Sequence, residues 1–538
     1  MSHNFSLLDI LILFFYLVTI LVIAFYSSRK KDKDFADYFL SGKSAGWVAI
    51  GMALFATNIS SEHFIGLAGS GAARGLAVAQ FELMAIFILI ILGWFIAPIY
   101  IKSGVTTVPE LFEKRFDSKS RKFLAGLSIG IYFLTKIMVT LLAGGLLFSK
   151  MFGLSIYTFA ILTILITGIY TIIGGATVVL RTQVVQSFIL IFGAVLLTAF
   201  GLHEVGGYSG LKAKLPADYF NMFKPISDPD FPWTGIIFGA PIIAFWYWCT
   251  DQYIVQRILG AKSIEDARRG SLLAALLKVL PLFILVIPGL IAIALFPEII
   301  GDEAYPTLLS SSIIPIGVKG LIVAGLLSAI MSSLSGVFNT IATLFVNDFY
   351  RHKHTEANER KLVLVGRLAT TVVVVLAILC VPLVKAVNSQ MYLFLQSVQA
   401  FVSPPIAAVF FFGIISKKIK AKAAFLTLLL GEAIGLSRFA ADLLIKFRFV
   451  EHPLIIAYSN VNFLHFAIFL FLTCAGMLFL INFALSKKMT SERNYLSFSL
   501  KESIQEIQSF KKIEKSRTSF VISGFILLII IGVWSLWS

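Results

Sequence analysis

Apolar segments long enough to cross a lipid bilayer recur along almost the whole chain. A helix needs about 20 mostly apolar residues to span the hydrocarbon core, and about fourteen such segments can be found. Charged residues make up only 14% of the sequence, whereas about a quarter of the residues of soluble proteins are charged. The predicted fold class is therefore an all-α polytopic membrane protein. Its helices are predicted near residues 8–27, 45–70, 78–101, 123–149, 155–173, 183–201, 233–256, 271–297, 313–347, 362–384, 391–415, 422–445, 462–486 and 519–537.

Lysines and arginines gather in every second connection between the predicted helices. Because basic loops stay in the cytoplasm, these connections are predicted to be cytoplasmic, and an even number of helices then places both termini outside. The net charge of +16 is spread over loops rather than over one nucleic-acid-binding face. We therefore expect a multi-pass plasma-membrane protein that meets the lipid bilayer and no nucleic acid. The basic connections lie at residues 29–43, 102–122, 257–269, 351–361, 417–422 and 487–517.

The segment at residues 55–70 carries polar side chains at membrane depth. Its sequence, FATNISSEHFIGLAGS, places an asparagine, serines, a glutamate, a histidine and glycines inside a predicted helix. Such groups are costly in lipid unless they are paired or face a cavity. Non-helical backbone at this depth is tolerated only where protein or a cavity surrounds it. The segment is therefore predicted to be a broken helix at the binding site of a transporter.

Further ionisable residues fall inside predicted helices, where each needs a partner. Arg438 and Asp442 are four residues apart, a spacing that predicts an ion pair between them. For the others, a structural ion pair or a position at the lipid headgroups is an alternative to a role in binding. These residues are Glu82, Lys136, Asp251, Lys278 and Glu432.

The seventh predicted helix contains the sequence WYWCTDQYIVQR, at residues 246–257. Aromatic rings beside hydrogen-bonding groups suit a polyhydroxylated ligand, because a sugar has an apolar face and a set of hydroxyls. The alternative is an aromatic belt at the membrane surface. A sugar-binding helix is the functional hypothesis for this segment.

The ninth predicted helix contains two adjacent serines, Ser332 and Ser333. They follow Ala329 by three and four residues, so their hydroxyls lie on the face of the helix near its carbonyl. Hydroxyls and carbonyls without a carboxylate form a weak site that suits a monovalent cation. Serine-mediated helix packing is the alternative. Much further along the chain, the two prolines Pro404 and Pro405 are predicted to interrupt another helix. The same helix also carries Gln396.

No nucleophile beside a base and no metal-binding spacing is evident, so no enzymatic activity is expected. The cysteines are predicted to be packing residues. They are Cys249, Cys380 and Cys474.

Together these segments resemble the sodium/solute symporter family, and within it the sodium/glucose cotransporter branch. The resemblance covers residues from about 36 to 445 and rests on motifs in the family's order and spacing. The motifs are FATNISSEHFIG, GATVVLRTQVVQ, WYWCTDQYIVQR, LLKVLPLFILVIPG, SAIMSSLSGVFNTIATLFVNDFYR and SPPIAAVF.

The resemblance implies a LeuT-type fold, in which two inverted repeats of five helices form a transport core. The core would occupy residues 41–445, with peripheral segments at 1–40 and 446–538. It also implies a symporter that imports a hexose or related polyol with Na⁺ by alternating access. The alternatives are another solute, such as myo-inositol, sialic acid or a carboxylate, a sugar-gated sensor or channel on the same fold, and a membrane-embedded transferase.

The resemblance also implies two sets of ligands. Asn58 would hold Tyr247, which serves as the inner gate over the sugar. The implied Na⁺ ligands are the carbonyls of Ala56, Ile59 and Ala329 and the hydroxyls of Ser332 and Ser333. The implied sugar ligands are His63, Glu82, Lys136, Trp246, Tyr247, Lys278 and Gln396.

Some details of the sequence depart from the family pattern, and others stay open. Thr182 and Gln183 stand where sugar-branch members have Thr-Asp, and Gly336 stands where a hydroxyl is found in members thought to bind a second Na⁺, so one Na⁺ per sugar is expected. Ala85 and Ala244 leave the exact sugar open. Glu62 has no predicted partner, and the oligomeric state is not indicated.

Overall fold

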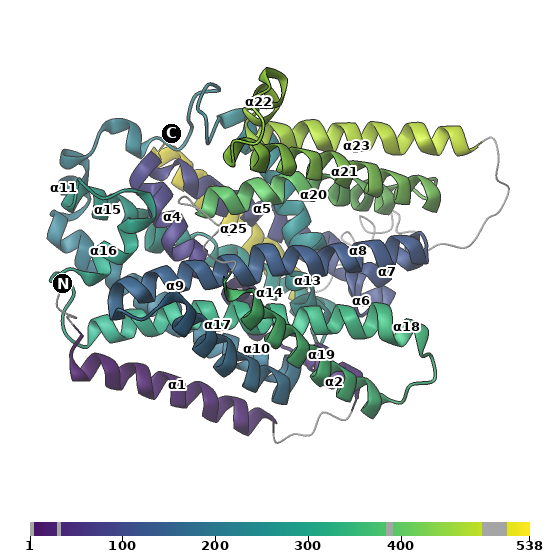
Figure 1. Cartoon of the computed structure of the whole chain (residues 1–538), viewed down its shortest axis with the longest axis horizontal. Helices are drawn as coiled ribbons and strands as arrows, with labels where there is room; N and C mark the ends of the chain where they lie inside the picture. Colours follow the sequence, from purple (N-terminus) through teal and green to yellow (C-terminus); the bar gives the residue numbers. More distant parts are fainter. Residues whose placement is uncertain (1–4, 29–33, 383–390, 487–513, 538) are drawn as a thin grey trace.

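The computed structural model describes residues 5–28, 34–382, 391–486 and 514–537, and within these ranges the chain is helical and contains no named strand. In Figure 1 the long helices lie side by side with their axes close to one common direction. The helices are α1 (Leu7–Ser28), α2 (Phe35–Leu40), α3 (Trp47–Asn58), α4 (Ser61–Arg74), α5 (Gln80–Ile91), α6 (Ala97–Ser103), α7 (Val108–Arg115), α8 (Ser118–Ile131), α9 (Met138–Phe152), α10 (Ile156–Val205), α11 (Gly207–Lys214), α12 (Ala240–Phe245), α13 (Gln252–Leu259), α14 (Ile264–Leu277), α15 (Ile287–Leu295), α16 (Ala304–Ser310), α17 (Val318–Leu344), α18 (Arg351–Lys353), α19 (Glu359–Cys380), α20 (Met391–Ile415), α21 (Ala421–Lys446), α22 (Pro453–Ser459), α23 (Phe463–Ser486) and α25 (Glu514–Trp537).

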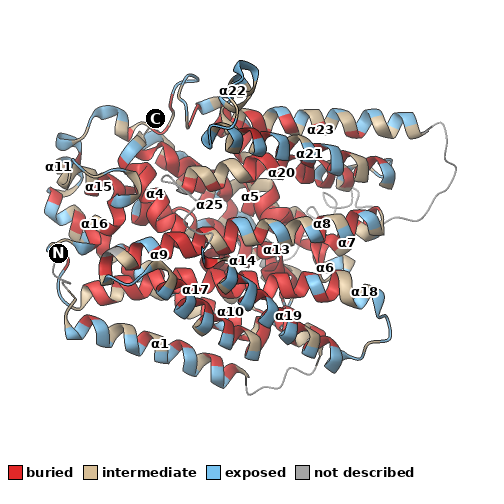
Figure 2. Ribbon diagram, viewed as in Figure 1, coloured by how far each residue is buried: buried red, intermediate tan, exposed pale blue. Residues whose placement is uncertain are grey.

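Ten helical spans in the described part of the chain are long and apolar enough to cross a membrane. The helices at the edge of the bundle, such as α1 and α23, expose large apolar side chains along their length. Exposed and half-buried residues follow these edge helices, and buried residues fill the middle (Figure 2). Apolar side chains directed outward are stable only in lipid, so the molecule is an integral membrane protein.

The centre of the bundle is α17, whose residues from Ile322 to Leu344 are all buried. A helix that is buried around its whole circumference lies in the interior of a protein. The long helix α10 packs along it, and α1 and α3 also contact it. The serines of the predicted cation site therefore lie at the core of the molecule.

The two helices predicted at residues 155–173 and 183–201 both lie within the helical stretch Ile156–Val205, which is divided by a kink with non-helical backbone at Gly175. The φ of 51° at this residue is open to glycine. A Cβ at this position would lie 2.4 Å from the carbonyl oxygen of Tyr38. Two helical segments therefore meet at a sharp bend beside α2.

Two helices break in the middle of the bundle. The predicted break within residues 55–70 is confirmed, because α3 ends at Asn58 and α4 begins at Ser61. A second break follows a π-helical turn at Trp246–Thr250, where Asp251 is extended before α13 begins. The predicted ion pair between Arg438 and Asp442 is also confirmed, with a nitrogen–oxygen distance of 3.4 Å. Most of the basic segment at 487–517 lies outside the described residues.

Candidate functional site

The break between α3 and α4 is formed by two residues with extended backbone. Ile59 has φ −77° and ψ 116°, and Ser60 has φ −133° and ψ −178°. A reciprocal capping box starts α4: the Ser60 side chain accepts from the backbone of His63, and the His63 ring accepts from the backbone N–H of Ser60. Because the helix stops here, the last carbonyls of α3 lack helical donors.

The carbonyl of Ala56 is bound instead by a side chain from α17. The Ser332 hydroxyl lies 2.8 Å from the Ala56 oxygen and 2.9 Å from the Ala329 oxygen. The adjacent Ser333 hydroxyl is buried and has no hydrogen-bond partner among the described residues. The structure thus brings together Ala56, Ala329 and Ser332, with Ser333 next to them in the chain and Ile59 at the break itself.

These oxygens fit a Na⁺ ion. They are uncharged oxygen donors, and hard cations bind oxygen. A buried hydroxyl without a partner is rare in native structures and points to a missing ligand. Two members of the donor set belong to it by position and not by a contact: the Ile59 carbonyl lies at the break, and the Ser333 hydroxyl follows Ser332 in the chain.

Tyr253 connects this first break to the second one. Its hydroxyl lies 2.8 Å from the carbonyl oxygen of Thr57 and 3.3 Å from that of Ser333. Tyr253 is the second residue of α13, which starts directly after Asp251. A single side chain thus contacts the end of α3, the serine pair of α17 and the helix that follows the second break.

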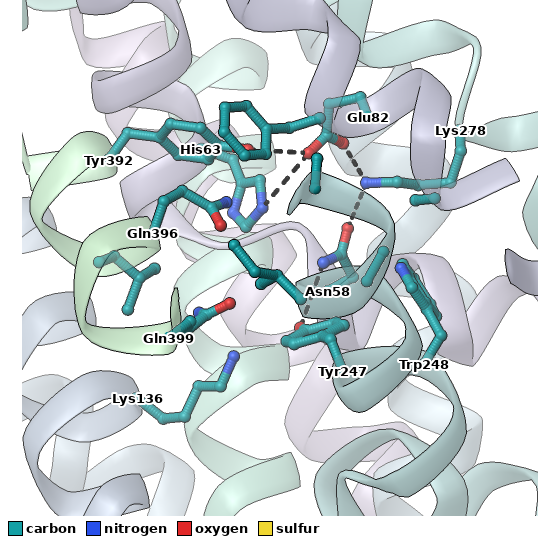
Figure 3. A pocket seen from close by; sticks show the side chains of 16 residues that line it. Asn58, His63, Glu82, Lys136, Tyr247, Trp248, Lys278, Tyr392, Gln396 and Gln399 are labelled. Carbon is teal, nitrogen blue, oxygen red and sulfur yellow. Dashed lines mark hydrogen bonds and ion pairs between the residues drawn. The ribbon is translucent and has the colours of Figure 1, made fainter. Parts of the chain in front are cut away.

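A polar pocket lies between the two breaks (Figure 3). The cavity volume is about 50 Å³, well below the roughly 300–1,000 Å³ of small-molecule sites, so the side chains around it must move apart to admit a ring-sized ligand. Six of the seven predicted sugar ligands line it, and so does Asn58. Its lining residues are Asn58, His63, Phe81, Glu82, Ala85, Lys136, Ala240, Ile243, Ala244, Tyr247, Trp248, Lys278, Tyr392, Leu395, Gln396 and Gln399.

A chain of hydrogen bonds runs along one wall of the pocket (Figure 3). The Lys278 ammonium donates to the Glu82 carboxylate and, at 2.6 Å, to the Asn58 carbonyl oxygen. The Asn58 amide then donates to the Tyr247 hydroxyl at 3.1 Å. Tyr392 donates to the other Glu82 oxygen at 3.3 Å. Donors and acceptors alternate along this wall, which suits a ligand whose hydroxyls both donate and accept.

The predicted gate residue Tyr247 is held on two sides. Asn58 binds its hydroxyl, and the Lys136 ammonium lies 4.3 Å from the centre of its ring. The same ammonium is 5.0 Å from the ring of Tyr253. Cations at these distances are attracted to the face of an aromatic ring. The ring is therefore fixed from the break of α3 and from the opposite side of the pocket.

Trp246 is the one predicted sugar ligand that the structure does not bring into the pocket. It is buried against Tyr247, with ring centroids 6.2 Å apart, and Trp248 lines the pocket in its place. The pocket-lining positions of this helix are 240, 243, 244, 247 and 248, the spacing of one helical face. Position 246 lies off that face.

The sequence prediction also missed three pocket residues on α20, two of them polar. The polar ones, Tyr392 and Gln399, line the pocket together with Gln396 and the apolar Leu395. Tyr392 and Gln399 are spaced four and three residues from Gln396, so they share one face of the helix. This spacing is visible in the sequence and could have identified both residues.

Glu62, for which no partner was predicted, is satisfied by hydroxyl groups. The Ser60 hydroxyl donates to its carboxylate, and the Thr140 hydroxyl does so at 3.3 Å. The two hydroxyl oxygens are themselves 3.0 Å apart. The carboxylate thus ties the start of α4 to α9, beside the break and outside the pocket lining.

Comparisons with known proteins agree with this geometry. The model of the sodium:solute symporter family matches residues 38–431. The sodium/myo-inositol cotransporter 2 of Sus scrofa is 39% identical over 472 residues, which cover 81% of this chain and 70% of that protein. The sodium/glucose cotransporter 1 of Ovis aries is 36% identical over 513 residues, which cover 86% of this chain and 76% of that protein.

A solved structure shows the same fold. A Na⁺-coupled sialic acid symporter, in a substrate-bound outward-open state, matches with a TM-score of 0.78 and 23% sequence identity. The match covers 92% of this chain and all of that chain. The family match extends from α2 into α21 and includes both breaks and the pocket. The chain belongs to the sodium:solute symporter family.

Proposed function

We propose that the chain is a Na⁺-coupled symporter that imports a polyhydroxylated ring, a hexose or a related polyol such as myo-inositol, with one Na⁺ per substrate. The observation that carries this proposal is that one helix end serves two sites. The carbonyl of Ala56 accepts a hydrogen bond from the Ser332 hydroxyl of α17. Asn58, two residues later in the same helix, lies in the pocket wall. An ion bound at the first site would therefore affect the second.

Coupling follows from this shared helix end. A Na⁺ ion between α3 and α17 would hold the last turn of α3, and with it the Asn58 amide that binds Lys278 and Tyr247. A ligand shifts a conformational equilibrium only through its different affinities for the two states. An ion that stabilises the arrangement of the pocket wall meets this condition. The membrane potential then supplies about 2.3 kcal/mol per 100 mV for each charge carried.

The substrate class follows from the pocket. Tyr247 and Trp248 offer aromatic surfaces, while Lys278, Glu82 and Gln396 offer donors and acceptors. A pyranose or inositol ring has apolar C–H faces and a belt of hydroxyls that match these two kinds of group. The similarity to sodium/myo-inositol and sodium/glucose cotransporters supports the same class.

The proposed stoichiometry rests on Gln183. Its side-chain amide donates to the Ser332 carbonyl at 3.1 Å and lies beside Gly336. A neutral amide and a glycine supply neither the charge nor the hydroxyl that a second cation would need there. One Na⁺ per cycle is therefore the proposed ratio.

We further propose fourteen membrane crossings in the plasma membrane, with both termini outside the cytoplasm. Each of the fourteen predicted segments coincides with helical structure in the described residues. The transport core is proposed to be residues 41–445, in two LeuT-type inverted repeats of five helices, with peripheral segments at 1–40 and 446–538. A helix break in each half of this core supports the proposal.

Uptake into proteoliposomes tests this function. Radiolabelled glucose, galactose, myo-inositol and sialic acid would be offered to purified protein with an inward Na⁺ gradient, and with K⁺ replacing Na⁺ as the control. We expect a hexose or inositol to accumulate above its external concentration only with Na⁺. Equal uptake with K⁺, or equilibration without accumulation, would contradict a symporter and favour a channel, and uptake of sialic acid alone would contradict the proposed substrate class.

A further inference from the structure

Arg257 is a buried cation without a matching carboxylate. It lies in α13, only 3% exposed, and its Nε donates to the Thr57 hydroxyl at 3.2 Å. Its Nη2 is buried and has no hydrogen-bond partner among the described residues. None of the ion pairs found in the described part of the chain includes Arg257. A buried guanidinium in this state is strongly unfavourable unless something compensates its charge.

The unpaired nitrogen lies close to the backbone of Gly336. A Cβ on Gly336 would lie 3.0 Å from Arg257 Nη2 and 3.5 Å from Gln183 Nε2. Any larger residue at position 336 would therefore crowd the guanidinium. Two N–H groups from different helices, α13 and α10, thus meet next to the small residue of α17.

Asn339, three residues after Gly336 on α17, gives a second and independent observation. Its side-chain nitrogen is also buried and has no hydrogen-bond partner in the described ranges. Residues three apart lie on nearly the same face of a helix. Asn339 therefore lies on nearly the same face of α17 as Gly336. Native proteins rarely leave buried donors such as this side-chain nitrogen unsatisfied.

Rearranging the side chains does not remove the problem. The Gln183 side-chain oxygen also lacks a partner, and turning its amide over would offer an acceptor to Arg257. An amide oxygen, like a water molecule, satisfies an N–H group but carries no net charge. Compensation of the guanidinium requires an anion.

We propose that a small monovalent anion, chloride, binds beside Gly336 and pairs with Arg257. The site adjoins the proposed Na⁺ ligands, because Gln183 Nε2 also donates to the Ser332 carbonyl, and Thr57 follows Ala56 directly. A chloride ion here offsets the repulsion between Arg257 and Na⁺, so each ion raises the affinity for the other. This reciprocal effect rests on the proposed Na⁺ site, whereas anion binding by Arg257 does not.

Thermal unfolding of the purified full-length protein in detergent tests the binding step without Na⁺. Melting curves would be recorded in potassium chloride, potassium bromide and potassium methanesulfonate at equal ionic strength. We expect a higher Tm in both halides than in methanesulfonate. Equal Tm values in the three salts would overturn the proposal. A halide effect in a protein that fails to transport sugar would leave the anion site standing and reject the proposed function alone.

Gln183→Asp locates the site. The carboxylate would stand beside Arg257 and replace the anion, so the halide effect on Tm should disappear. Gln183→Asn is the matched control, because asparagine has the size of aspartate without its charge. This variant should retain a halide effect on Tm. A halide effect of wild-type size in Gln183→Asp would overturn the assignment to Arg257.

The coupling step is measured as the Na⁺ concentration that gives half of the maximal Na⁺-induced rise in Tm. We expect this concentration to be about fivefold or more higher in methanesulfonate than in chloride, a difference at the lower end of ordinary coupling between sites. In Gln183→Asp it should be the same in both salts. An unchanged Na⁺ midpoint in the wild-type protein, together with a halide effect on Tm, would reject the coupling and keep the binding site.

Discussion

The two helix breaks have nearly the same backbone and different surroundings. Ile59 at the first break has φ −77° and ψ 116°, and Asp251 at the second has φ −78° and ψ 118°. At the first break the carbonyls of Ala56 and Thr57 accept from the hydroxyls of Ser332 and Tyr253, which come from other helices. At the second break the Asp251 carboxylate itself caps the next helix, accepting from the N–H of Tyr253 at 3.1 Å.

The difference extends to what each break contacts. The carbonyls of Ala56 and Thr57 meet Ser332 and Tyr253, groups that an ion can displace or join. At the second break Asp251 also accepts from the Tyr132 hydroxyl. Both breaks therefore combine a carbonyl bound by a hydroxyl from another helix with a capped following helix, and they differ in the cap, which is a serine with a histidine at the first break and an aspartate at the second. We propose that the carbonyl end at the first break takes part in the ion site and that the second break positions the proposed gate residue Tyr247.

The largest expected effect comes from the first break. Ser333→Ala removes the unpartnered hydroxyl of the proposed Na⁺ site and should abolish the Na⁺ dependence of uptake while the protein stays folded. Ser328→Ala is the matched control, since its hydroxyl bonds to the Ala324 carbonyl in the preceding turn of the same helix and should leave Na⁺ dependence intact. Uptake in proteoliposomes with Na⁺ or K⁺ measures both. Unaltered Na⁺ dependence in Ser333→Ala would reject the site.

A substitution at the second break should lower the stability of the protein and leave the coupling between Na⁺ and substrate unchanged. Asp251→Ala removes a helix cap and the acceptor of the buried Tyr132 hydroxyl, which should destabilise the protein by about 2 kcal/mol. Thermal melting measures the loss, and the Na⁺ midpoint should change little. Asp251→Asn can still cap the helix and should lose much less. A normal Tm in Asp251→Ala with a shifted Na⁺ midpoint would reverse the roles assigned to the two breaks.

The link between the breaks should have an intermediate effect. Tyr253→Phe deletes the hydroxyl that binds Thr57 and Ser333 and leaves the ring in place. Loss of one such hydrogen bond is worth about 1 kcal/mol, which corresponds to roughly fivefold weaker Na⁺ binding. Na⁺ titration of Tm or of uptake checks this value. No change in the Na⁺ midpoint would show that the two breaks act independently.

The smallest effect on Na⁺ is expected at Gln396, which lines the pocket away from both breaks. Gln396→Glu exchanges a donor for a charge, so substrate affinity should change by roughly fivefold, or about 1 kcal/mol, with little change in expression or Na⁺ midpoint. Concentration-dependent uptake gives the substrate affinity. A shift in Na⁺ affinity larger than that in substrate affinity would argue against a separate substrate pocket.

The fold could be predicted where the sequence itself carries a strong physical signal. Polar residues inside an apolar segment predicted the break at Ile59 and Ser60, because lipid does not tolerate them elsewhere. The i, i+4 spacing predicted the pair of Arg438 and Asp442. The two helices predicted at residues 155–173 and 183–201 meet at a kink at Gly175, where a positive φ changes the direction of the chain within a few residues.

The site was predictable by residue type more than by orientation. Six of the predicted sugar ligands meet in one pocket, yet Trp246 and Trp248 could be distinguished only by the helical face that also carries Ala240, Ala244 and Tyr247. One hydroxyl partner of Glu62, Ser60, caps the same helix two residues earlier, whereas the other, Thr140, comes from α9, a contact that no spacing along the chain reveals.

The central claim is that one helix end couples the ion to the substrate. Its most direct test is the equilibrium binding of the transported sugar or inositol to purified protein with and without Na⁺, in wild type and in Ser333→Ala. Coupling of ordinary size predicts a substrate Kd about tenfold lower with Na⁺ in the wild type, and no effect of Na⁺ in the variant. A wild-type substrate Kd that is the same with and without Na⁺ would contradict the account.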